Sequence, residues 1–329
     1  MTAPDLSIVI VTWNSRDDVL RCLDAVESGK PALDVEVVLV DNASSDDTVS
    51  AVRSRYPHVR IVENSTNRGF PRANNQGLEI ARGRHILLLN PDTQVGSDTV
   101  GTCVETLDVE AEVGAVGCRL LYPDGSVQYE CARRAYRLAH LVWEAFYLHV
   151  IFPRNRVFAH QLMGDWDHTG VRDVEAISGA FFMARREVFD AVARVPDAVF
   201  MYHEDLSLCL KIRERGWRIR FRGDVSTVHH HGRSAGQSSL ALHLLEGPVR
   251  VLLIQARAGR FAGAAARVLF AFRGGVRLVL SVLGWLIPGT ARLRRERPRA
   301  FDPRVHLDQI LWALLPWAVR DRMPRATRS

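Results

Sequence analysis

The strongest constraint on this fold is the alternation of strand-like and helix-like segments over residues 6–89. Short, β-branched apolar runs alternate with segments whose apolar residues recur every three or four positions. The expected strands are 6–12, 35–40, 59–63 and 85–89, and the expected helices are 16–28, 46–55 and 72–81. Short connections between such elements imply right-handed crossovers and a mostly parallel sheet with helices on both faces. The predicted fold class is therefore α/β.

The pattern is less regular in the segment that follows. We expect strands at 113–117, 176–184, 219–222 and 225–228, a helix at 204–215 and a hairpin turn at Tyr122–Ser126. Residues 128–172 lose periodicity and mix arginines, histidines and aromatic residues. A long irregular stretch inside a compact domain is usually a binding loop or lid, so we expect substrate selection there.

The C-terminal part is strongly basic. Residues 246–329 carry 16 arginines and five acidic residues among apolar stretches, whereas the whole chain has a formal net charge of +6. The longest uncharged stretch, 278–291, contains Pro288 and is shorter than the roughly 20 apolar residues of a spanning helix. We expect interfacial helices, broken near Gly274-Gly275, and a basic cluster at 292–299 for anionic lipids. The alternative is an ordinary amphipathic helix with its arginines in water. Nucleic acid is not an expected partner, because no recognition motif accompanies the arginines.

Cysteine usage and missing motifs disfavour several classes of protein. The five cysteines are scattered and form no CxxC pair, which argues against disulfides or a zinc site and for a reducing, cytoplasmic compartment. The first apolar run lacks a basic n-region and a cleavage site, so we interpret it as a strand. Without P-loop, GxGxxG, GxSxG or HExxH motifs, P-loop hydrolysis, hydride transfer, esterase and zincin functions are disfavoured.

Polar side chains follow the expected strands, at the edge where open α/β sheets bind their ligands. Asn, Asp and Ser at such places also cap helices and form turns. A carboxylate directly after two strands, at Asp41 and Asp92, nevertheless favours a functional site. Asp92 suits a divalent cation, because Mg²⁺ needs one or two carboxylates beside substrate phosphates. The alternative for Asp92 is an Asx turn after Pro91.

Two later segments carry titratable groups. Glu204 and Asp205 open the expected helix 204–215, where acids interact favourably with the helix dipole and where one of them is a candidate general base. The triplet His229–His231 ends the last expected strand, so at most two of its rings can face one site. A zinc site is not supported there, because no Cys and no spaced His pair accompanies the triplet.

Seven segments together resemble glycosyltransferase family 2, and their spacing resembles its bacterial rhamnosyltransferase-type branch. In order they are LSIVIVTWNS, VVLVDNASSDDT, NRGFPRANNQG, LLLNPDT, ISGAFFMARREVFD, HEDLSLCLKIRERGWRI and VHHHGRS. The resemblance covers about residues 6–236, most of the chain. It implies a GT-A fold, a nucleoside-diphosphate sugar donor, a divalent cation (Mg²⁺ or Mn²⁺) and inversion at the anomeric carbon.

The resemblance also implies roles for individual residues. Asp92 matches the last acid of a metal-binding DxD motif, with Asn90 in place of the first acid. His230 or His231 matches a late histidine near the metal and the diphosphate. The residues that match the donor nucleotide site are Thr12, Asn14, Asp41, Asn67, Gly69 and Asn75.

The same resemblance implies the chemistry. Asp205, beside Glu204, matches the catalytic base that takes a proton from the acceptor hydroxyl. The expected activity is transfer of a sugar, rhamnose in this branch, from a donor such as dTDP-rhamnose to a glycan or polyprenyl-linked acceptor in cell-surface polysaccharide synthesis. Two alternatives remain: a GT-A-like nucleotidyltransferase, which would normally show a glycine-rich loop after the first strand, and a non-catalytic membrane-bound scaffold.

The expected domain organisation follows from these assignments. A catalytic domain of residues 1–245 would comprise a nucleotide-sugar half, about 1–117, and an acceptor half, about 118–245. Residues 246–329 would form a basic, amphipathic helical extension. The protein is expected to lie on the inner face of the cell membrane, bound peripherally to its anionic surface.

Overall fold

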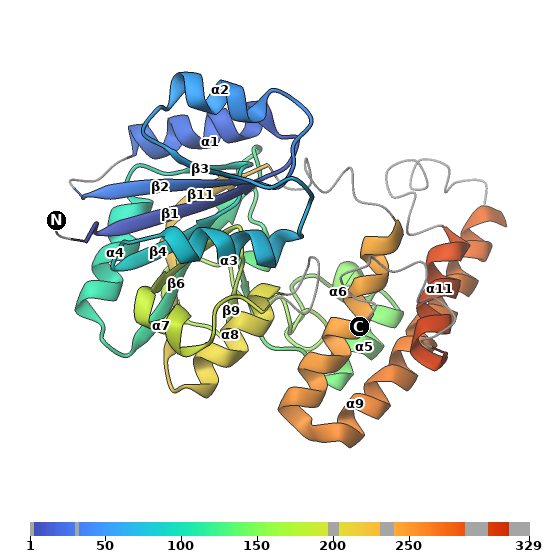
Figure 1. Ribbon diagram of the computed structural model, residues 1–329. Coiled ribbons are helices and arrows are strands. Elements are labelled where there is room, and N and C mark those ends of the chain that lie inside the picture. The colour runs from blue at the N-terminus through green and yellow to red at the C-terminus, as the bar shows by residue number, and fades with distance from the viewer. Residues whose placement is uncertain (1–2, 30–32, 197–203, 231–239, 287–301, 316–329) are drawn as a thin grey trace. The chain divides into compact units, whose positions relative to one another are not determined.

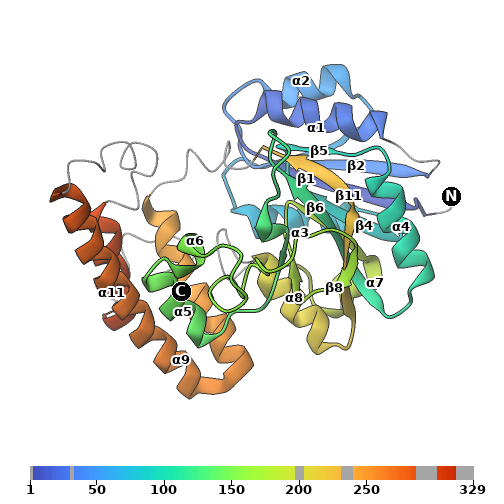
Figure 2. The same ribbon diagram turned by 180° about the vertical axis from the view of Figure 1, so that it is seen from behind.

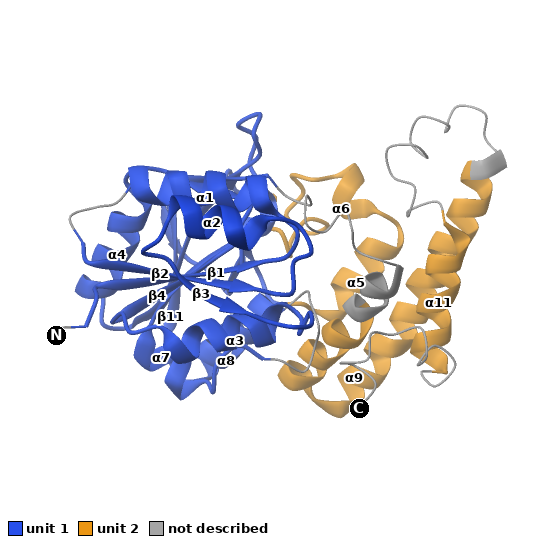
Figure 3. Cartoon of the chain, turned by 45° about the horizontal axis from the view of Figure 1, so that its top comes forward, with its two compact units in different colours: residues 1–135, 166–237 blue, residues 136–165, 238–329 orange. Residues whose placement is uncertain are grey.

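The computed structural model describes residues 3–29, 33–196, 204–230, 240–286 and 302–315. Two of the features expected above, His231 and the basic cluster 292–299, lie outside these residues. The chain forms two compact units (Figure 3): unit 1 comprises residues 1–135 and 166–237, and unit 2 comprises residues 136–165 and 238–329. Residues 136–165 thus group with the C-terminal helices, and the functional division at residue 245 remains a prediction.

One large sheet forms the centre of unit 1 (Figure 1). Its strand order is β3-β2-β1-β4-β10-β6-β11-β5, and β8 pairs with β11. Strands β3, β2, β1 and β4 pair in parallel, β10 runs antiparallel between β4 and β6, and β11 pairs in parallel with β6. The predicted α/β class with a mostly parallel sheet is confirmed. The strands are β1 Leu6–Thr12, β2 Val35–Asp41, β3 Arg60–Glu63, β4 His85–Leu89, β5 Thr93–Val95, β6 Val113–Leu121, β8 Val171–Asp173, β10 Phe181–Arg185 and β11 Arg218–His229.

Helices cover both faces of this sheet, with α1 and α2 on one face and α3 and α8 on the other (Figure 1). Strands β1 and β4 are buried along their whole length, which is why Val, Ile and Leu dominate both of their faces. Helix α3 approaches β1 closely, because a Cβ added to Gly77 would lie 2.3 Å from Cγ1 of Val9. The helices are α1 Arg16–Ser28, α2 Thr48–Arg55, α3 Phe70–Ile80, α4 Thr99–Val109, α7 Arg186–Ala191 and α8 Glu204–Glu214.

The last strand of unit 1 is longer than expected. The predicted strands 219–222 and 225–228 form one strand, β11 (Figure 2). Its register against β6 shifts between Arg222 and Ser226. Gly223 lies in this interval, where a Cβ would come within 2.4 Å of the carbonyl oxygen of His168. The irregularity that the sequence suggested as a break is therefore a bulge in a continuous strand.

The segment between β6 and β10 also differs in detail. The predicted hairpin turn is confirmed by the hydrogen bond from Tyr122 N to Ser126 O, 2.8 Å long. The predicted strand 176–184 divides into β9, Ala176–Ile177, which pairs with β7, Ala132–Arg133, and β10, which belongs to the large sheet. A short 3₁₀ helix, Tyr129–Cys131, precedes β7.

The regular elements described in unit 2 are helices, and residues 152–165 form turns. Its helices are α5 Leu138–Ala145, α6 Leu148–Ile151, α9 Leu240–Leu286 and α11 Pro303–Leu314. The expectation of an irregular loop over 128–172 is thus wrong for part of its length. Helix α5 has little more than two turns of helical periodicity, too few to predict alone, and packs against α9 with Leu141 and Ala145 fully buried.

Helix α9 changes direction at a different glycine from the one expected. Gly259 has φ of 84°, a left-handed value that glycine adopts without strain. The helix continues through Gly274-Gly275, so the predicted break there is wrong. Gly274 instead permits close packing against α11, because a Cβ would lie 2.8 Å from Cγ1 of Ile310. Within the described ranges, no helix has the apolar length that a bilayer span requires.

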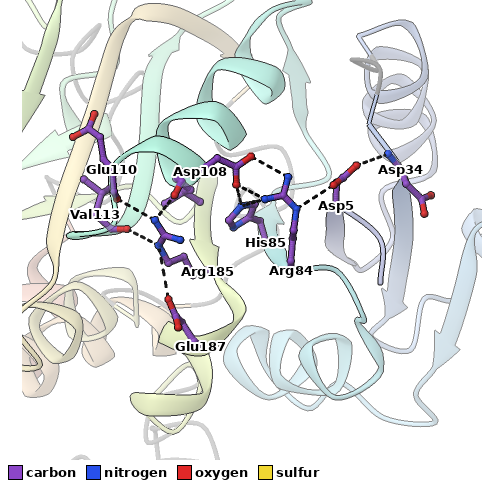
Figure 4. A network of polar contacts seen from close by, with 10 residues as sticks. Asp5, Asp34, Arg84, His85, Asp108, Glu110, Val113, Arg185 and Glu187 are labelled. Carbon is purple, nitrogen blue, oxygen red and sulfur yellow. Dashed lines mark hydrogen bonds and ion pairs between the residues drawn. The ribbon is translucent and has the colours of Figure 1, made fainter. Parts of the chain in front are cut away.

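A polar network ties together elements at the amino-terminal edge of the large sheet (Figure 4). Arg84, which precedes β4, donates from Nη2 to Asp108 Oδ2 over 2.9 Å and from Nε to Asp5 Oδ1 over 3.0 Å. His85 Nε2 lies 2.7 Å from Asp108 Oδ1. The hydrogen bonds from Arg84 hold the pKa of Asp108 below its usual range. The network joins the start of β1, the start of β4 and the end of α4.

We predict that Asp108→Asn lowers the melting temperature at neutral pH, because it removes the charge that Arg84 and His85 face. The native pKa of Asp108 is lowered relative to the unfolded value of about 3.9. Its contribution is therefore complete above that pH and is lost as the pH falls through the native pKa. Thermal unfolding across this range should show a gap between wild type and variant that narrows toward acid. Asp190→Asn, at an exposed position of α7, is the control; a gap independent of pH would contradict the prediction.

Candidate active site

The carboxyl ends of the first parallel strands meet at one edge of the sheet. The register places Thr12 opposite Asp41, and Asp41 opposite Glu63. The Thr12 hydroxyl shares a hydrogen bond with the Ser15 hydroxyl at 2.8 Å, and the Thr12 carbonyl accepts from Asn42 N at 2.8 Å. Two of the residues predicted for the nucleotide site, Thr12 and Asp41, therefore lie side by side and are buried.

Asp41 is a buried carboxylate with one oxygen that lacks a partner. Its Oδ2 accepts a hydrogen bond from the backbone N–H of Ser44 at 2.9 Å. Its Oδ1 is also buried and has no hydrogen-bond partner. A buried acceptor without a hydrogen bond costs about 1–3 kcal/mol of folding free energy. The geometry therefore suits a ligand that brings an N–H donor to this point, as the imide of a uracil or thymine base does.

Asn14 joins the loops that follow β1 and β2. Its backbone N donates to Ser44 Oγ at 2.9 Å, and its Oδ1 accepts from Ser45 N at 2.7 Å. Its φ of 48° lies in the left-handed region, which Asn tolerates better than most residues. Asn14 thus positions the loop that follows Asp41.

A network of side-chain amides orders the next loop. Asn67 Oδ1 accepts from Asn42 Nδ2 at 2.8 Å and from Gly69 N at 3.0 Å. Asn64 and Gln76 exchange two hydrogen bonds of 2.9 Å, and Asn64 also donates to Asn42. Gly69 has φ of 85° and begins α3. Asn67 and Gly69 are therefore held against the residue that follows Asp41.

Asn75 of α3 does not bond to this amide network but to the backbone of Val195. Its Nδ2 donates to the carbonyl of Val195 at 2.9 Å, and its Oδ1 accepts from Val195 N at 3.0 Å. The side chain thus anchors the chain just before residues 197–203, which the structure does not describe. The structure does not bring Asn75 into the amide network around Asn67.

Asp92 lies beside a histidine at the end of β11. The residue is 6% exposed, and its Oδ1 is 3.3 Å from Nε2 of His229. His229 Nδ1 is 2.8 Å from Oε1 of Gln128, whose Nε2 donates to the His229 carbonyl. Asn90 Nδ2 is 3.4 Å from His229 Nε2. This arrangement fixes the orientation of the imidazole that faces the Asp92 carboxylate.

His230 and His231 were the histidines predicted to lie near the metal. The backbone N of His230 donates to the Asp92 carbonyl at 2.9 Å, but its ring reaches Oε1 of Gln94 at 3.3 Å. His231 is outside the described residues. The ring that the structure brings to the Asp92 carboxylate is that of His229, the first member of the triplet.

The residues around Asp92 supply only some of the ligands that a divalent cation needs. No group of three or more His, Cys, Asp or Glu side chains gathers at one point in the part of the chain that the structure describes. Asp92 and His229 together offer one carboxylate and one imidazole. Mg²⁺ commonly takes one or two carboxylates and completes its shell with substrate phosphates and water. The pair therefore fits a cation that arrives with a diphosphate.

Asp205 occupies the first turn of α8 in a largely buried ion pair. The Arg133 guanidinium donates to Asp205 Oδ2, and their side chains are 9% and 13% exposed. The same oxygen accepts from the backbone N of Gly179 at 3.0 Å. Glu204, the adjacent residue, is half-buried.

The segment at the start of β10 links Asp205 to the loop that carries Asp92. Phe181 pairs with Leu89, and Asn90 N donates to the carbonyl of Ala180 at 3.0 Å. Gly179, directly before Ala180, donates to Asp205. A short backbone segment thus connects the loop after β4, which carries Asp92, with the first turn of α8.

Sequence reasoning missed three residues of this site. His229 was passed over in favour of its two neighbours, because alternation along a strand does not say which ring faces inward. Gln128 and Arg133 lie in a stretch without periodicity. Nothing in the sequence there distinguishes Gln128 from other polar residues or Arg133 from the other arginines. The one available signal for Arg133 is indirect. A carboxylate such as Asp205 is rarely buried without a charged partner, so a partner of some kind was to be expected.

An open, mostly parallel α/β sheet with buried carboxylates at its carboxyl edge is the arrangement expected of a GT-A fold. The chain belongs to the family described as Glycosyl transferase family 2, whose sequence profile matches residues 7–192. The chain is accordingly a glycosyltransferase.

Two of its relatives are similar to this chain over most of its length. The N-acetylglucosaminyl-diphospho-decaprenol L-rhamnosyltransferase of Mycobacterium tuberculosis is 29% identical over 254 residues, which are 72% of this chain and 81% of that protein. The O-antigen biosynthesis protein RfbC of Myxococcus xanthus is 28% identical over 234 residues, which are 70% of this chain and 18% of that protein. The chain is thus similar to a rhamnosyltransferase along most of that enzyme's length.

A solved structure supports the fold assignment. The mannosyltransferase PcManGT of Pyrobaculum calidifontis, in complex with GDP-Man and Mn²⁺, superposes with a TM-score of 0.57 and 19% identity. The superposition covers 96% of this chain and 88% of that one. This likeness shows the fold.

Proposed function

We propose that this protein transfers a sugar, rhamnose, from dTDP-rhamnose to a hydroxyl of a polyprenyl-diphosphate-linked glycan, with inversion, in cell-surface polysaccharide synthesis. The observation that carries the proposal is the convergence of Asp41, Asp92 and Asp205 at one edge of one sheet. The similarity to the mycobacterial rhamnosyltransferase supports the choice of sugar and acceptor.

The donor nucleotide would bind along the ends of β1 and β2. Asp41 Oδ1 offers a buried acceptor for a base N–H, and Thr12 and Asn14 hold the loops on either side. Asn67 and Gly69 shape the loop before α3. Because these groups are already hydrogen-bonded to one another, little ordering would accompany binding.

The donor diphosphate would lie near Asp92 and His229. These two residues would hold a divalent cation, Mg²⁺ or Mn²⁺, together with the diphosphate oxygens. When bound, such a cation neutralises charge on the departing diphosphate. Gln128 contributes by fixing the tautomer and the orientation of His229.

Asp205 would act as the base on the acceptor side. Its carboxylate takes the proton of the acceptor hydroxyl as that oxygen bonds to the anomeric carbon. The bond from that carbon to the donor phosphate oxygen breaks on the opposite face, and its electron pair leaves with the nucleoside diphosphate. Arg133 and Gly179 N hold the carboxylate in place for this transfer. Such a base contributes about 10²–10⁴ in rate.

Unit 2 supports association with a membrane surface. Beyond Gly259, α9 carries an apolar stripe on its solvent side, whose members are 46% to 94% exposed: Phe261, Val268, Phe272, Val279 and Leu283. Ala266, Phe270 and Ser281, on the opposite side of the helix, are buried. An exposed apolar stripe on a basic segment suits the interface of an anionic bilayer. We propose peripheral binding to the inner face of the cell membrane.

The two alternative functions are less well supported. A nucleotidyltransferase is disfavoured by the family match over residues 7–192. A non-catalytic scaffold would have no need of a buried Asp205–Arg133 pair, because burying charges costs free energy that apolar residues would not. A donor hydrolysis assay with a panel of nucleoside-diphosphate sugars tests both alternatives directly.

Asp205→Asn should abolish transfer while leaving donor binding nearly intact, because the base acts on the acceptor. We expect turnover to fall by about 10²–10⁴. Turnover is measured with dTDP-rhamnose and a polyprenyl-diphosphate acceptor, and donor affinity is measured by calorimetry. Asp98→Asn, at an exposed position, is the matched control. Near-wild-type turnover in Asp205→Asn would show that another group is the base.

Asp92→Ala should weaken donor binding in a metal-dependent way, because Asp92 is the carboxylate assigned to the cation. The expected loss in affinity is about ten-fold or more when Mn²⁺ or Mg²⁺ is present. Titration of the donor with and without the cation measures it, with Asp98→Ala as the control. A metal titration identical to that of the wild type would remove Asp92 from the cation site.

The double variant Val268→Ser/Val279→Ser should reduce binding to anionic vesicles, because it removes two exposed members of the apolar stripe. The loss should persist at high salt, which screens only the electrostatic part. We expect about a ten-fold effect in liposome flotation. Val109→Ser, 76% exposed in unit 1, is the control. Full-length protein that stays in the soluble fraction at low salt would overturn the membrane proposal.

A further inference from the structure

Unit 2 contains three arginines around one largely buried glutamate. Glu144 of α5 is 14% exposed, and its Oε2 lies 2.6 Å from Arg250 Nη1 and 3.4 Å from Arg273 Nε. Arg277 donates from Nη2 to the backbone carbonyl of Glu144 at 2.9 Å. We call these four residues, with His149 of α6, the Glu144 cluster.

The guanidinium groups are held from two sides. Arg273 lies over the ring of Phe270 at 5.0 Å, and Arg277 lies over the ring of Tyr147 at 4.4 Å. Burial opposes ionisation of Glu144, but the three nearby guanidinium charges outweigh it and lower its pKa to about 2. The carboxylate is therefore charged at neutral pH. Burial lowers the pKa of His149, whose ring is then neutral.

Arg277 and His149 each contribute one buried nitrogen atom that has no hydrogen-bond partner. These atoms are Nε of Arg277, which always carries a proton, and Nδ1 of His149. The ion pair of Glu144 with Arg250 explains how α5 is attached to α9, but it leaves these two atoms without a role. An oxyanion with several acceptor oxygens is the group that guanidinium and imidazole N–H donors bind best.

Exposed apolar side chains adjoin the cluster in the chain. Phe146 and Phe272 are 45% and 46% exposed, and their rings meet edge to face at 5.9 Å. Phe146 lies between Glu144 and Tyr147 in sequence, and Phe272 directly precedes Arg273. A ligand that fits both features has an anionic head and a hydrocarbon chain.

We propose that the Glu144 cluster binds a phosphate ester carried on a hydrocarbon chain, with Arg277 and His149 as its hydrogen-bond donors. This chemistry is shared by a polyprenyl-diphosphate acceptor and by the headgroup of an anionic phospholipid. The inference rests on the proposed function for its acceptor, and it gives unit 2 a specific binding site in addition to a general attraction to membranes.

The test uses full-length protein and vesicles of three compositions. The vesicles are phosphatidylcholine alone, phosphatidylcholine with phosphatidylglycerol, and phosphatidylcholine with polyprenyl phosphate at the same charge. Flotation is compared for wild type, Arg277→Gln and His149→Gln at low and high salt. Arg260→Gln is the matched control, because it removes one positive charge at an exposed position of α9.

We expect Arg277→Gln to weaken binding to one or both phosphate-bearing vesicles by about ten-fold or more, also at high salt. His149→Gln should weaken it in the same direction. The loss in Arg260→Gln should be smaller and should vanish at high salt, because exposed charges are screened. Loss confined to polyprenyl phosphate identifies the acceptor as the ligand, and equal loss with phosphatidylglycerol identifies the bilayer headgroup.

Two outcomes would overturn the inference. One is that Arg277→Gln and His149→Gln bind all vesicles as Arg260→Gln does. The other is that their loss is equal on pure phosphatidylcholine, which would reflect damage to the packing. Should Arg277→Gln fail to fold, Arg277→Lys keeps the charge but loses the Nε donor and takes its place in the comparison. Vesicle binding needs no sugar donor, so failure of this site and failure of the proposed transfer reaction are separate results.

Discussion

The parallel register of β1, β2 and β4 is the constraint on which the site depends. Parallel strands all end at the same edge of the sheet. The strand register alone therefore brings together Thr12, Asp41 and the loop after Leu89, and no side-chain contact is needed for this. The strands are buried on both faces, and polar chemistry is therefore confined to the loops at their ends. The antiparallel strand β10 then adds a second requirement. It begins at this edge, where the two residues before it, Gly179 and Ala180, connect Asn90 with Asp205.

The three carboxylates of the candidate site, Asp41, Asp92 and Asp205, are buried or largely buried, and each has different partners. Asp205 is paired with Arg133, which offsets the loss of its hydration. Asp92 faces His229, whose imidazole could hold a cation together with the carboxylate. Asp41 keeps one oxygen without a partner, at a cost that a bound nucleotide would recover. These differences match the proposed roles of Asp205 as the catalytic base, Asp92 as the cation ligand and Asp41 as the acceptor for the nucleobase. Each role needs a carboxylate whose charge is balanced by its partners to a different degree.

The sequence predicted those parts of the fold whose signals are local. Strands β1 and β4 are buried on both faces, and their apolar runs are visible without knowledge of their neighbours. Asp41 and Asp92 were found because carboxylates after such runs are conspicuous. The structure of β11 could not be predicted, because its bulge at Gly223 depends on the backbone of His168. Arg133 and His229 could not be chosen either, since their roles come from packing partners far away in the chain.

Helix α9 shows how non-local packing determines which side chains unit 2 buries and which it exposes. Its break at Gly259 depends on a backbone conformation that glycine permits but does not demand, so composition pointed equally well to Gly274-Gly275. Close packing on α11 instead uses Gly274, and this places Arg273 and Arg277 on the face that meets α5. The apolar stripe must then lie on the other side, exposed to solvent. One helix thus presents buried guanidinium groups on one side and hydrocarbon on the other. These two surfaces fit the proposed lipid-linked acceptor, which has an anionic head and a hydrocarbon chain, while other arginines of the helix, such as Arg260, are exposed.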